Sequence, residues 1–344
     1  MAINIGFLSF GHWGQTRGSL VRSAKDAILQ TIEFAVAAEE VGVDGAWIRV
    51  HHFEQNLSSP FPLLAAMAAR TSRIELGTGV INMRYENALY MAELAATADL
   101  ISGGRLQLGL SRGSPELAAD GPAAFGYPLL PGKLPVEDAH ERIALFRRAI
   151  AGEGVASAGE QVRPASGMLP ISPMSPGLAD RIWYGAGNTE SARRVGELGM
   201  NLMSSTLVLE ATGEPLGVIQ ARQIAAYREA FAAAGHTRRP RVSVSRSILP
   251  IVDDETRTYF SAIAMQEATG GGVDQIGIID DVRATFGRTY VGEPDAIAAE
   301  LAQDEAVVSA DTLLVTTPNQ LGVAMNARML AAIVEHIKPA LGKG

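Results

Sequence analysis

The sequence predicts an α/β fold, a (β/α)₈ TIM barrel with insertions at the C-terminal ends of its strands. Three observations lead to this prediction. β-rich runs alternate with longer runs of helical periodicity, the unit occurs eight times, and 344 residues with 47% apolar content can bury one large core. Strict strand–helix alternation requires a parallel sheet with right-handed crossovers. A closed barrel, one domain over residues 1–344, is the simplest such sheet, although an open doubly wound sheet has the same local pattern.

The predicted strands are short runs rich in β-branched, aromatic and other apolar residues. In chain order they are INIGFLSF (3–10), GAWIRVHH (45–52), IELGTGVI (74–81), RLQLGLS (105–111), RIWYGAG (181–187), NLMSST (201–206), RVSVSRSILPI (241–251) and TLLVTT (312–317).

The predicted helices have apolar residues spaced by three and four positions. The first helix is the clearest, because Ser23 with Asp26 three residues later forms a capping box. An apolar stripe beginning at Ile28 and Ile32 follows, and Gly42 ends the helix. In chain order the helices cover residues 23–42, 62–71, 87–102, 137–151, 189–198, 216–234, 294–303 and 321–338.

Two connections are longer than the usual few residues. The first comprises 113–135 and 152–180, which are rich in Gly, Pro and Ser, and the second is 252–292. We expect all of them at the barrel mouth, meaning the C-terminal ends of the strands, where such barrels carry their active sites. The triplet Gly270–Gly272 suits either the hinge of a lid formed by 252–292 or a disordered surface loop.

Composition excludes several function classes. A net charge of −8 and a pI of about 5.4 give no field that would recruit nucleic acid or an anionic membrane. The absence of cysteine excludes disulfides, thiolate-bound zinc and iron–sulfur clusters. The first ten residues lack the features of a signal peptide, and no stretch has the roughly 20 apolar residues that span a bilayer. We therefore expect a cytoplasmic protein.

Two adjacent histidines, His51 and His52, end the second predicted strand, and they could be metal ligands, packing residues or a catalytic base. Because side chains alternate along a strand, only one of them can point into the lumen. The side chains expected to face the helices are Ala46, Ile48 and Val50, and those expected to face the lumen are Trp47, Arg49 and His51. His12 is the one further histidine near a strand end, so a metal site is not expected.

Strands three and four are assigned to faces in the same way. The outward set is Ile74, Leu76, Val80, Leu106, Leu108 and Leu110, and the inward set is Glu75, Gly77, Gly79, Gln107, Gly109 and Ser111. The inward glycines either make room for a flat ligand or offset bulky neighbours such as Trp47 and Met83. Arg49 and Glu75 are costly to bury unpaired, so we expect them to pair with each other or with Gln107.

A candidate phosphate site lies in GAGNTESARRVGELG (185–199). Here Asn188 or Thr189 caps a helix with Ser191 in its first turn, and free backbone N–H groups at a helix N-terminus bind phosphate. Arg112, after strand four, could reach the same phosphate. Taken alone, this pattern is an ordinary helix start. A phosphate site is favoured because Arg112 and the helix start follow two adjacent strands, the fourth and the fifth. No dinucleotide fingerprint or P-loop motif occurs.

Five segments in this order resemble the bacterial luciferase-like, flavin-dependent monooxygenase family. They are EEVGVDGAWIRVHHF, IELGTGVI, ADLISGGRLQLGLSRGS, IWYGAGNTESARRVGELG and YVGEPDAIAAEL, which together cover nearly the whole chain. Each segment alone is weakly specific, whereas the combination is specific. The resemblance implies a TIM barrel, in agreement with the strand and helix count.

The resemblance also implies roles for individual residues. The first histidine of the family's His-His-Phe motif, its catalytic base, corresponds to His51. The family's non-proline cis peptide, which supports the flavin ring, corresponds to Gly79–Val80. Flavin-ring and phosphate contacts correspond to Ser111 and Arg112. The family's phosphate loop corresponds to Ala186, Gly187, Asn188 and Ser191.

Luciferase itself differs from this chain at several of these positions. It has cysteine at the position of Ser111, glutamate at that of Val50, and glutamate and serine at those of Gly187 and Asn188. Light emission from long-chain aldehydes is therefore not expected.

The resemblance predicts an FMN-dependent monooxygenase that acts with O₂ on a small organic substrate and receives reduced flavin from a separate reductase. An F420-dependent oxidoreductase of the same family is the alternative, although the ending LSRGS is closer to the FMN branch. A flavin-binding protein without catalysis and a metal-dependent barrel hydrolase are the other classes considered. The resemblance also implies a homodimer, formed through the helices beside strands two and three.

Overall fold

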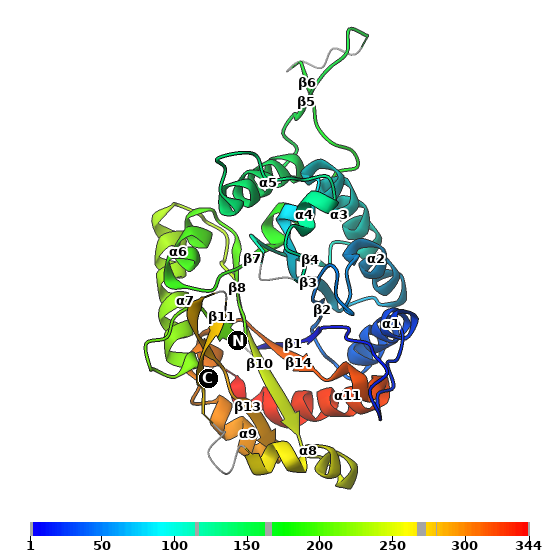
Figure 1. Ribbon diagram of the computed structural model, residues 1–344, viewed down its shortest axis with the longest axis vertical. Coiled ribbons are helices and arrows are strands. Elements are labelled where there is room, and N and C mark those ends of the chain that lie inside the picture. Colours follow the sequence, from blue (N-terminus) through cyan, green and yellow to red (C-terminus); the bar gives the residue numbers. More distant parts are fainter. Residues whose placement is uncertain (1–2, 114–116, 162–166, 267–272, 280, 343–344) are drawn as a thin grey trace.

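A computed structural model describes residues 3–113, 117–161, 167–266, 273–279 and 281–342. Eight parallel strands form its centre: β1 (Asn4–Ser9), β2 (Gly45–Ile48), β3 (Glu75–Asn82), β4 (Leu106–Ser111), β7 (Ile182–Gly185), β8 (Asn201–Ser204), β10 (Val242–Pro250) and β14 (Thr312–Thr317). They pair in the order β10-β14-β1-β2-β3-β4-β7-β8, and β8 pairs again with β10. The sheet is therefore closed, and the predicted TIM barrel is confirmed (Figure 1).

Helices between the strands form the outer ring of the barrel (Figure 1). They are α1 (Ala24–Glu40), α2 (Pro60–Arg70), α3 (Ala88–Ser102), α5 (Pro135–Ile150), α6 (Thr189–Glu197), α7 (Leu216–Ala233), α9 (Pro294–Leu301) and α11 (Gly322–Ala332). The capping box predicted for α1 is present, because Asp26 N–H donates to Ser23 Oγ at 3.1 Å and Ser23 N–H donates to Asp26 Oδ2 at 2.9 Å. Helical turns continue α11 through Ile333–Ile337 and Lys338–Leu341.

Several short elements were not predicted. They are α4 (Gly121–Ala124), β5 (Ala156–Ser157), β6 (Met168–Leu169), β9 (Leu207–Val208), α8 (Asp254–Gln266), β11 (Gln275–Ile279), β12 (Val282–Phe286), β13 (Thr289–Gly292), α10 (Glu305–Ser309) and single turns at Met83–Tyr85, Leu178–Arg181 and Asn319–Leu321. The segment 252–292 thus contains a helix and an antiparallel hairpin, β11–β12, whose second strand also pairs with β9. The triplet Gly270–Gly272 lies outside the described residues.

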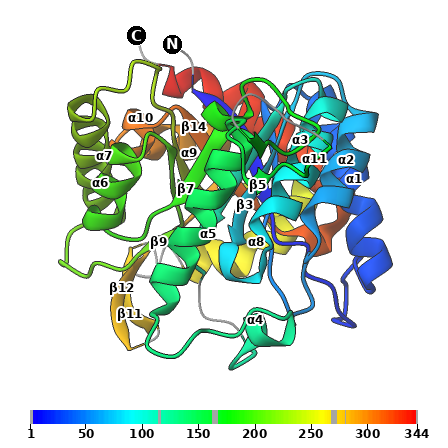
Figure 2. The same cartoon turned by 90° about the horizontal axis from the view of Figure 1, so that it is seen from above.

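The insertions do not all lie at the same end of the barrel. α4 and the hairpin β11–β12 lie at the end away from the chain termini (Figure 2). The expectation that 152–180 also lies at the mouth is wrong. This segment joins the end of α5 to the start of β7, and Arg181 Nε donates to the carbonyl oxygen of Leu106, the first residue of β4. In a parallel barrel a helix-to-strand connection lies at the N-terminal ends of the strands.

A polar layer closes the N-terminal end of the barrel interior. Glu75 accepts hydrogen bonds from Gln107 at 3.0 Å and from both Nη atoms of Arg241 at 2.8 and 2.9 Å. Gln107 in turn accepts from Trp183 Nε1 at 2.8 Å. The predicted Glu75–Gln107 contact is confirmed, but the predicted Arg49–Glu75 pair is wrong, because Arg241 of β10 supplies the positive charge instead.

An apolar layer lies next to the polar one and fills the middle of the barrel. Its members are Leu8, Trp47, Trp183, Met203 and Leu314, with Phe10 and Val80 packed against them. A Cβ at Gly77 would lie 2.3 Å from the Trp47 ring, and a Cβ at Gly109 would lie 2.1 Å from the Thr78 carbonyl oxygen. These two glycines therefore make room for neighbouring protein atoms rather than for a ligand.

Val80 is the residue whose predicted face is wrong. The pairing of β3 with β4 is irregular between Thr78 and Ile81, and the Gly79–Val80 peptide is cis, as the resemblance implied. Strict alternation therefore fails at this point, and the Val80 side chain packs with the interior cluster instead of the helices.

Candidate active site at the barrel mouth

His51 lies just past the end of β2, at the barrel mouth. β2 ends at Ile48, earlier than predicted, because the chain then turns so that His51 N–H donates to the Leu57 carbonyl oxygen at 2.9 Å. The His51 side chain is 8% exposed and uses both ring nitrogens. Nε2 accepts from Arg49 Nε at 2.9 Å, and Nδ1 lies 3.2 Å from Glu54 Oε1. The imidazole is thus held at both nitrogens by charged neighbours.

His12, in the segment after β1, is electrostatically coupled to this group. Its ring stacks on Phe10, with centroids 5.6 Å apart, and the Arg49 guanidinium lies 4.7 Å from the Phe10 centroid. Burial lowers the pKa of His12, Arg49 and His51 lower it further, and Glu54 opposes them. Two histidines, one arginine and one glutamate therefore share a small, partly buried region beside β1 and β2.

His52 packs away from this group. Its ring stacks on Tyr85, with centroids 4.2 Å apart, and meets Phe125 edge-on at 5.0 Å. Phe53, which has a positive φ of 59°, extends the cluster. A Cβ at Gly121 would lie 1.8 Å from the Tyr85 hydroxyl, so only glycine fits there. His52 is a packing residue of this aromatic cluster, which joins the ends of β2 and β3 to α4.

Gly79, Val80 and Ser111 border the mouth on the side of β3 and β4. A Cβ placed on Gly109 or Gly185 would lie 3.1 or 3.4 Å from Val80 Cγ1. The Val80 side chain thus lies against the backbone of both β4 and β7. Ser111 is 9% exposed, and its Oγ accepts from Gly113 N–H at 3.1 Å.

The predicted anion-binding helix start is only partly free. Asn188 caps α6, because its Oδ1 accepts from Ser191 N–H at 2.8 Å. Thr189 N–H donates to the carboxylate of Glu210 at 2.6 Å. Glu190 N–H has no partner within the described part of the chain. Sequence analysis missed Glu210, which follows β9 and is 21 residues away from Thr189.

Two arginines gather near this helix start. Burial raises the pKa of the Tyr184 hydroxyl, and the charges of Arg112 and Arg194 oppose that rise. Burial lowers the pKa of His140, and Arg194 and Arg112 lower it further. Both guanidinium groups therefore lie close to these two rings, between α5 and α6. Arg194 was not predicted, although its position three residues after Ser191 places both on one face of α6.

Ala186 and Gly187 are less available than the resemblance implied. The Ala186 methyl group belongs to the core under the helices, and its N–H donates to the Met203 carbonyl oxygen at 3.0 Å. The Gly187 carbonyl oxygen accepts from Leu209 N–H at 2.6 Å, and the Leu209 side chain packs over Gly187. Asn188 and Ser191 therefore stand together at the start of α6, whereas Ala186 is buried.

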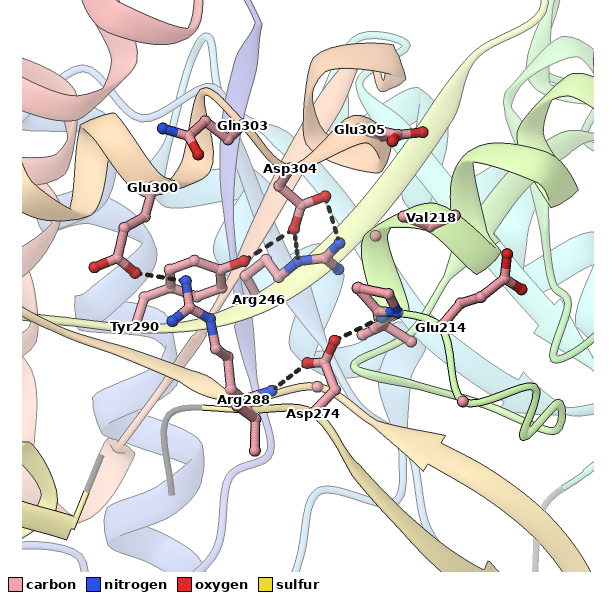
Figure 3. A pocket seen from close by; sticks show the side chains of 16 residues that line it. Glu214, Val218, Arg246, Asp274, Arg288, Tyr290, Glu300, Gln303, Asp304 and Glu305 are labelled. Carbon is pink, nitrogen blue, oxygen red and sulfur yellow. Dashed lines mark hydrogen bonds and ion pairs between the residues drawn. The ribbon is translucent and has the colours of Figure 1, made fainter. Parts of the chain in front are cut away.

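A separate cavity of about 470 Å³ lies outside the barrel, where β13 leaves β10 (Figure 3). Five of its charged groups have partners: Arg246 pairs with Asp304, Arg288 pairs with Glu300, and Asp274 accepts from the backbone N–H of Leu216 and Arg288. Over the described ranges no group of three or more His, Asp or Glu side chains is placed to hold a metal ion. Within the same ranges no helix is long and apolar enough to cross a lipid bilayer.

Comparisons with known proteins agree with this architecture. A family model described as luciferase-like monooxygenase matches residues 5–328. Among solved structures, the oxygenating constituent of 3,6-diketocamphane monooxygenase from Pseudomonas putida, in complex with FMN, superimposes with a TM-score of 0.70. The superposition covers 98% of this chain and 99% of that chain at 20% sequence identity, which is a likeness of fold.

Curated relatives match shorter stretches. The 4-hydroxyprotoasukamycin monooxygenase of Streptomyces nodosus subsp. asukaensis is 32% identical over 109 residues, or 31% of this chain and 29% of that protein. The F420-dependent glucose-6-phosphate dehydrogenase of Kineococcus radiotolerans is 30% identical over 207 residues, or 54% of this chain and 60% of that protein. The chain thus spans less than two thirds of the length of either relative.

Proposed function

Because the chain belongs to the luciferase-like monooxygenase family, an enzyme family, we propose that it is an FMN-dependent monooxygenase that acts with O₂ on a small organic substrate. One observation carries the proposal. At a single barrel mouth, the buried and hydrogen-bonded His51 accompanies a capped helix start that is flanked by Arg112 and Arg194. The first provides a proton-transferring group, and the second suits a ligand with a phosphate group.

The residues present fit a phosphate monoester. Arg112 and Arg194 are exposed guanidinium groups whose charges act on the same buried tyrosine. The backbone N–H of Glu190 stands at the positive end of the α6 dipole, beside the Ser191 hydroxyl, which would have to exchange its bond to the Asn188 carbonyl oxygen for one to phosphate. These groups would hold the phosphate, while Ser111 and the Gly79–Val80 backbone would hold the ring.

FMN in its reduced form would supply the reaction with O₂, chemistry that no side chain provides. The chain's own residues would orient the ligand and manage protons. His51 would accept or return a proton at Nε2, a role that suits an imidazole near neutral pH. The aromatic cluster of His52, Tyr85 and Phe125 would exclude water on one side of the mouth, and the segment 252–292 would cover it as a lid. A separate reductase would supply the reduced flavin.

Replacing Arg112 by alanine tests the phosphate site. Since charge-assisted hydrogen bonds contribute about 1.5 to 3 kcal/mol each, Arg112→Ala should weaken FMN binding about 10- to 100-fold. Riboflavin, which lacks the phosphate, should bind wild type and variant alike. Calorimetric titration of both ligands measures the difference.

The matched control is Arg193→Ala, which removes an equal charge from an exposed position beside Arg194. It should leave FMN affinity within about twofold, because exposed charges that make no direct contact are screened. An equal loss of riboflavin affinity in Arg112→Ala would mean that Arg112 does not act on the phosphate.

Glu210 competes for the same helix start. Its carboxylate takes the Thr189 N–H, so Glu210→Gln should remove a negative charge from the phosphate position and tighten FMN binding about fivefold, equivalent to about 1 kcal/mol. Riboflavin binding should not change. Glu190→Gln removes an exposed charge from the same helical turn without touching the Thr189 bond and should have a smaller effect. Unaltered FMN affinity in Glu210→Gln would place the phosphate elsewhere.

An F420-dependent oxidoreductase is the second candidate, favoured by the 30% identity to an F420-dependent dehydrogenase. Parallel titrations with FMN, reduced FMN and F420 separate the two. We expect FMN or its reduced form to bind more tightly than F420, and the reverse order would assign the chain to the F420 branch.

We also propose a homodimer through α3. Four large apolar side chains on this helix are exposed, namely Tyr90, Leu94, Leu100 and Ile101. Tyr90, Leu94 and Ile101 are spaced by four and seven positions, so they fall on one face of the helix, and exposed apolar surface of this kind marks association sites. Light scattering should give twice the chain mass for the wild type and the single chain mass for Leu94→Glu. A monomeric wild type at micromolar concentration would refute this proposal.

A further inference from the structure

Four side chains from one short segment after β2 form a continuous hydrogen-bonded chain. Arg49 Nε donates to His51 Nε2 at 2.9 Å, and His51 Nδ1 lies 3.2 Å from Glu54 Oε1. The other carboxylate oxygen of Glu54 accepts from Asn56 Nδ2 at 2.6 Å. The order along the chain is therefore guanidinium, imidazole, carboxylate and amide.

This arrangement fixes the tautomer of His51. A guanidinium group has N–H donors and no acceptor, so the Nε2 that faces Arg49 must carry a lone pair. The proton of the neutral ring then resides on Nδ1, where it donates to Glu54. The backbone holds the ring in place as well, because His51 N–H donates to the Leu57 carbonyl oxygen. The nitrogen left as a base is thus Nε2.

We propose that Glu54 and Arg49 are positioning residues that set the proton-accepting state of His51. Glu54 holds the Nδ1–H tautomer and stabilises the imidazolium that forms when Nε2 takes a proton. Arg49 keeps Nε2 unprotonated until a reacting group replaces it. This inference rests on the proposed function, in which His51 is the base.

Arg49 has to leave Nε2 when the proton transfers. An O–H of the reacting group gives its proton to Nε2, the bonding electron pair stays on that oxygen, and His51 becomes a cation with N–H donors on both nitrogens. The N–H of Arg49 would then face the new N–H of His51 Nε2, and the two positively charged side chains would repel each other. The Phe10 ring, 4.7 Å from the guanidinium carbon, offers Arg49 another partner.

Other charged groups near the ring bear on its proton uptake. Arg49 and Glu54 come from its own segment, and His12 comes from the segment after β1. Burial lowers the pKa of His12, and the charges of Arg49 and His51 lower it further, so His12 carries less positive charge than a free histidine at the same pH. Arg49 and Glu54, which carry opposite charges, are therefore the groups that determine how readily His51 takes up a proton.

The first test needs no cofactor and no turnover. In ¹⁵N-histidine-labelled protein at alkaline pH, the His51 signals, identified by their loss in His51→Gln, should show a protonated Nδ1 and an unprotonated Nε2. The double variant Arg49→Met with Glu54→Ala should revert to the Nε2–H form that predominates in free histidine. An Nε2–H form in the wild type would overturn the proposal.

The second test uses the pH dependence of turnover in the FMN-loaded enzyme. Glu54→Gln should move the acid limb of kcat to lower pH by about one pH unit, because the imidazolium loses its counter-charge. Arg49→Met should move it to higher pH by a similar amount, because a neighbouring cation is removed. Glu229→Gln, at an exposed position of α7, is the control and should not move it.

The outcomes separate this inference from the function on which it rests. Acid limbs that stay unchanged in both variants, in an enzyme that needs His51, would refute the roles of Glu54 and Arg49 alone. The expected ¹⁵N pattern together with unaltered turnover in a His51 variant would refute His51 as the base. The tautomer assigned to His51 from its contacts with Arg49 and Glu54 would still be correct.

Discussion

Replacing His51 by alanine should lower turnover about 10²- to 10⁴-fold, the range that a positioned general acid or base contributes. FMN affinity should remain within about twofold, because the proposed phosphate contacts come from β4 and α6. The physical reason is that we propose Nε2 of His51 as the proton acceptor, and alanine has no group to replace it. Steady-state oxidation with reduced FMN and O₂, beside a binding titration, measures both quantities.

His52→Ala is the matched control for this experiment. Its ring packs on Tyr85 and Phe125, so its loss should reduce stability but retain proton transfer at His51. Turnover that survives in His51→Ala would favour the alternative of a flavin-binding protein in which His51 does no chemistry. Loss of FMN binding in the same variant would instead assign His51 to the ligand pocket.

Replacing Asp304 by alanine should cost about 3 to 5 kcal/mol of unfolding free energy, the usual effect of breaking a buried ion pair. The Asp304 carboxylate accepts from Arg246 at 2.8 and 3.0 Å and from the Tyr290 hydroxyl at 3.0 Å (Figure 3). It also accepts from the backbone N–H groups that begin α10. Both members of the pair are nearly inaccessible, with 2% and 6% of the side chains exposed. The alanine variant leaves the Arg246 charge buried without a counter-charge. Urea denaturation measures the loss.

Two further variants give this prediction its controls. Glu293→Ala breaks an ion pair of similar length, 2.9 Å to Arg257, in which both side chains are more than half exposed. It should cost less than about 1 kcal/mol. The double variant Arg246→Met with Asp304→Leu should regain much of the stability lost in Asp304→Ala, since it leaves no unpaired buried charge. Equal destabilisation by Asp304→Ala and Glu293→Ala would contradict the expectation that the buried ion pair contributes more stability than the exposed one.

The Asp304 contribution also has a defined pH dependence. Burial opposes ionisation of Asp304, but the charge and hydrogen bonds of Arg246 outweigh burial and hold its pKa below the ordinary value. A lowered folded-state pKa stabilises the protein at pH values above the unfolded pKa of about 3.9. The stability difference between wild type and Asp304→Ala should therefore be complete at neutral pH. It should shrink as pH falls below about 4.

The barrel and the strand faces of β2 were predictable because they depend on local periodicity. Apolar residues at alternate positions assign Ile48 and Val50 to the core under the helices and Trp47 to the lumen, and the structure agrees. The capping box at Ser23 is equally local. Such signals involve residues within a few positions of each other, so they can be recognised without knowing how the rest of the chain folds.

The errors in strand faces and connections have separate physical causes. The Val80 side chain faces inward because the register of β3 against β4 is irregular between Thr78 and Ile81, and β-propensity carries no sign of such an irregularity. The prediction that 152–180 lies at the barrel mouth conflicts with the predicted order of elements. A segment that follows a helix and precedes a strand lies at the N-terminal end of the barrel.

The sequence by itself determined the strand and helix periods, the caps and the residue types available at the mouth. The tertiary structure alone decided their partners. Arg241 reaches Glu75 across 166 positions, and Glu210 occupies the start of α6 from a different strand end. Closure of the sheet brings these distant residues together, and charges then pair with whichever opposite charge is nearest in space, because a buried charge without a partner is costly.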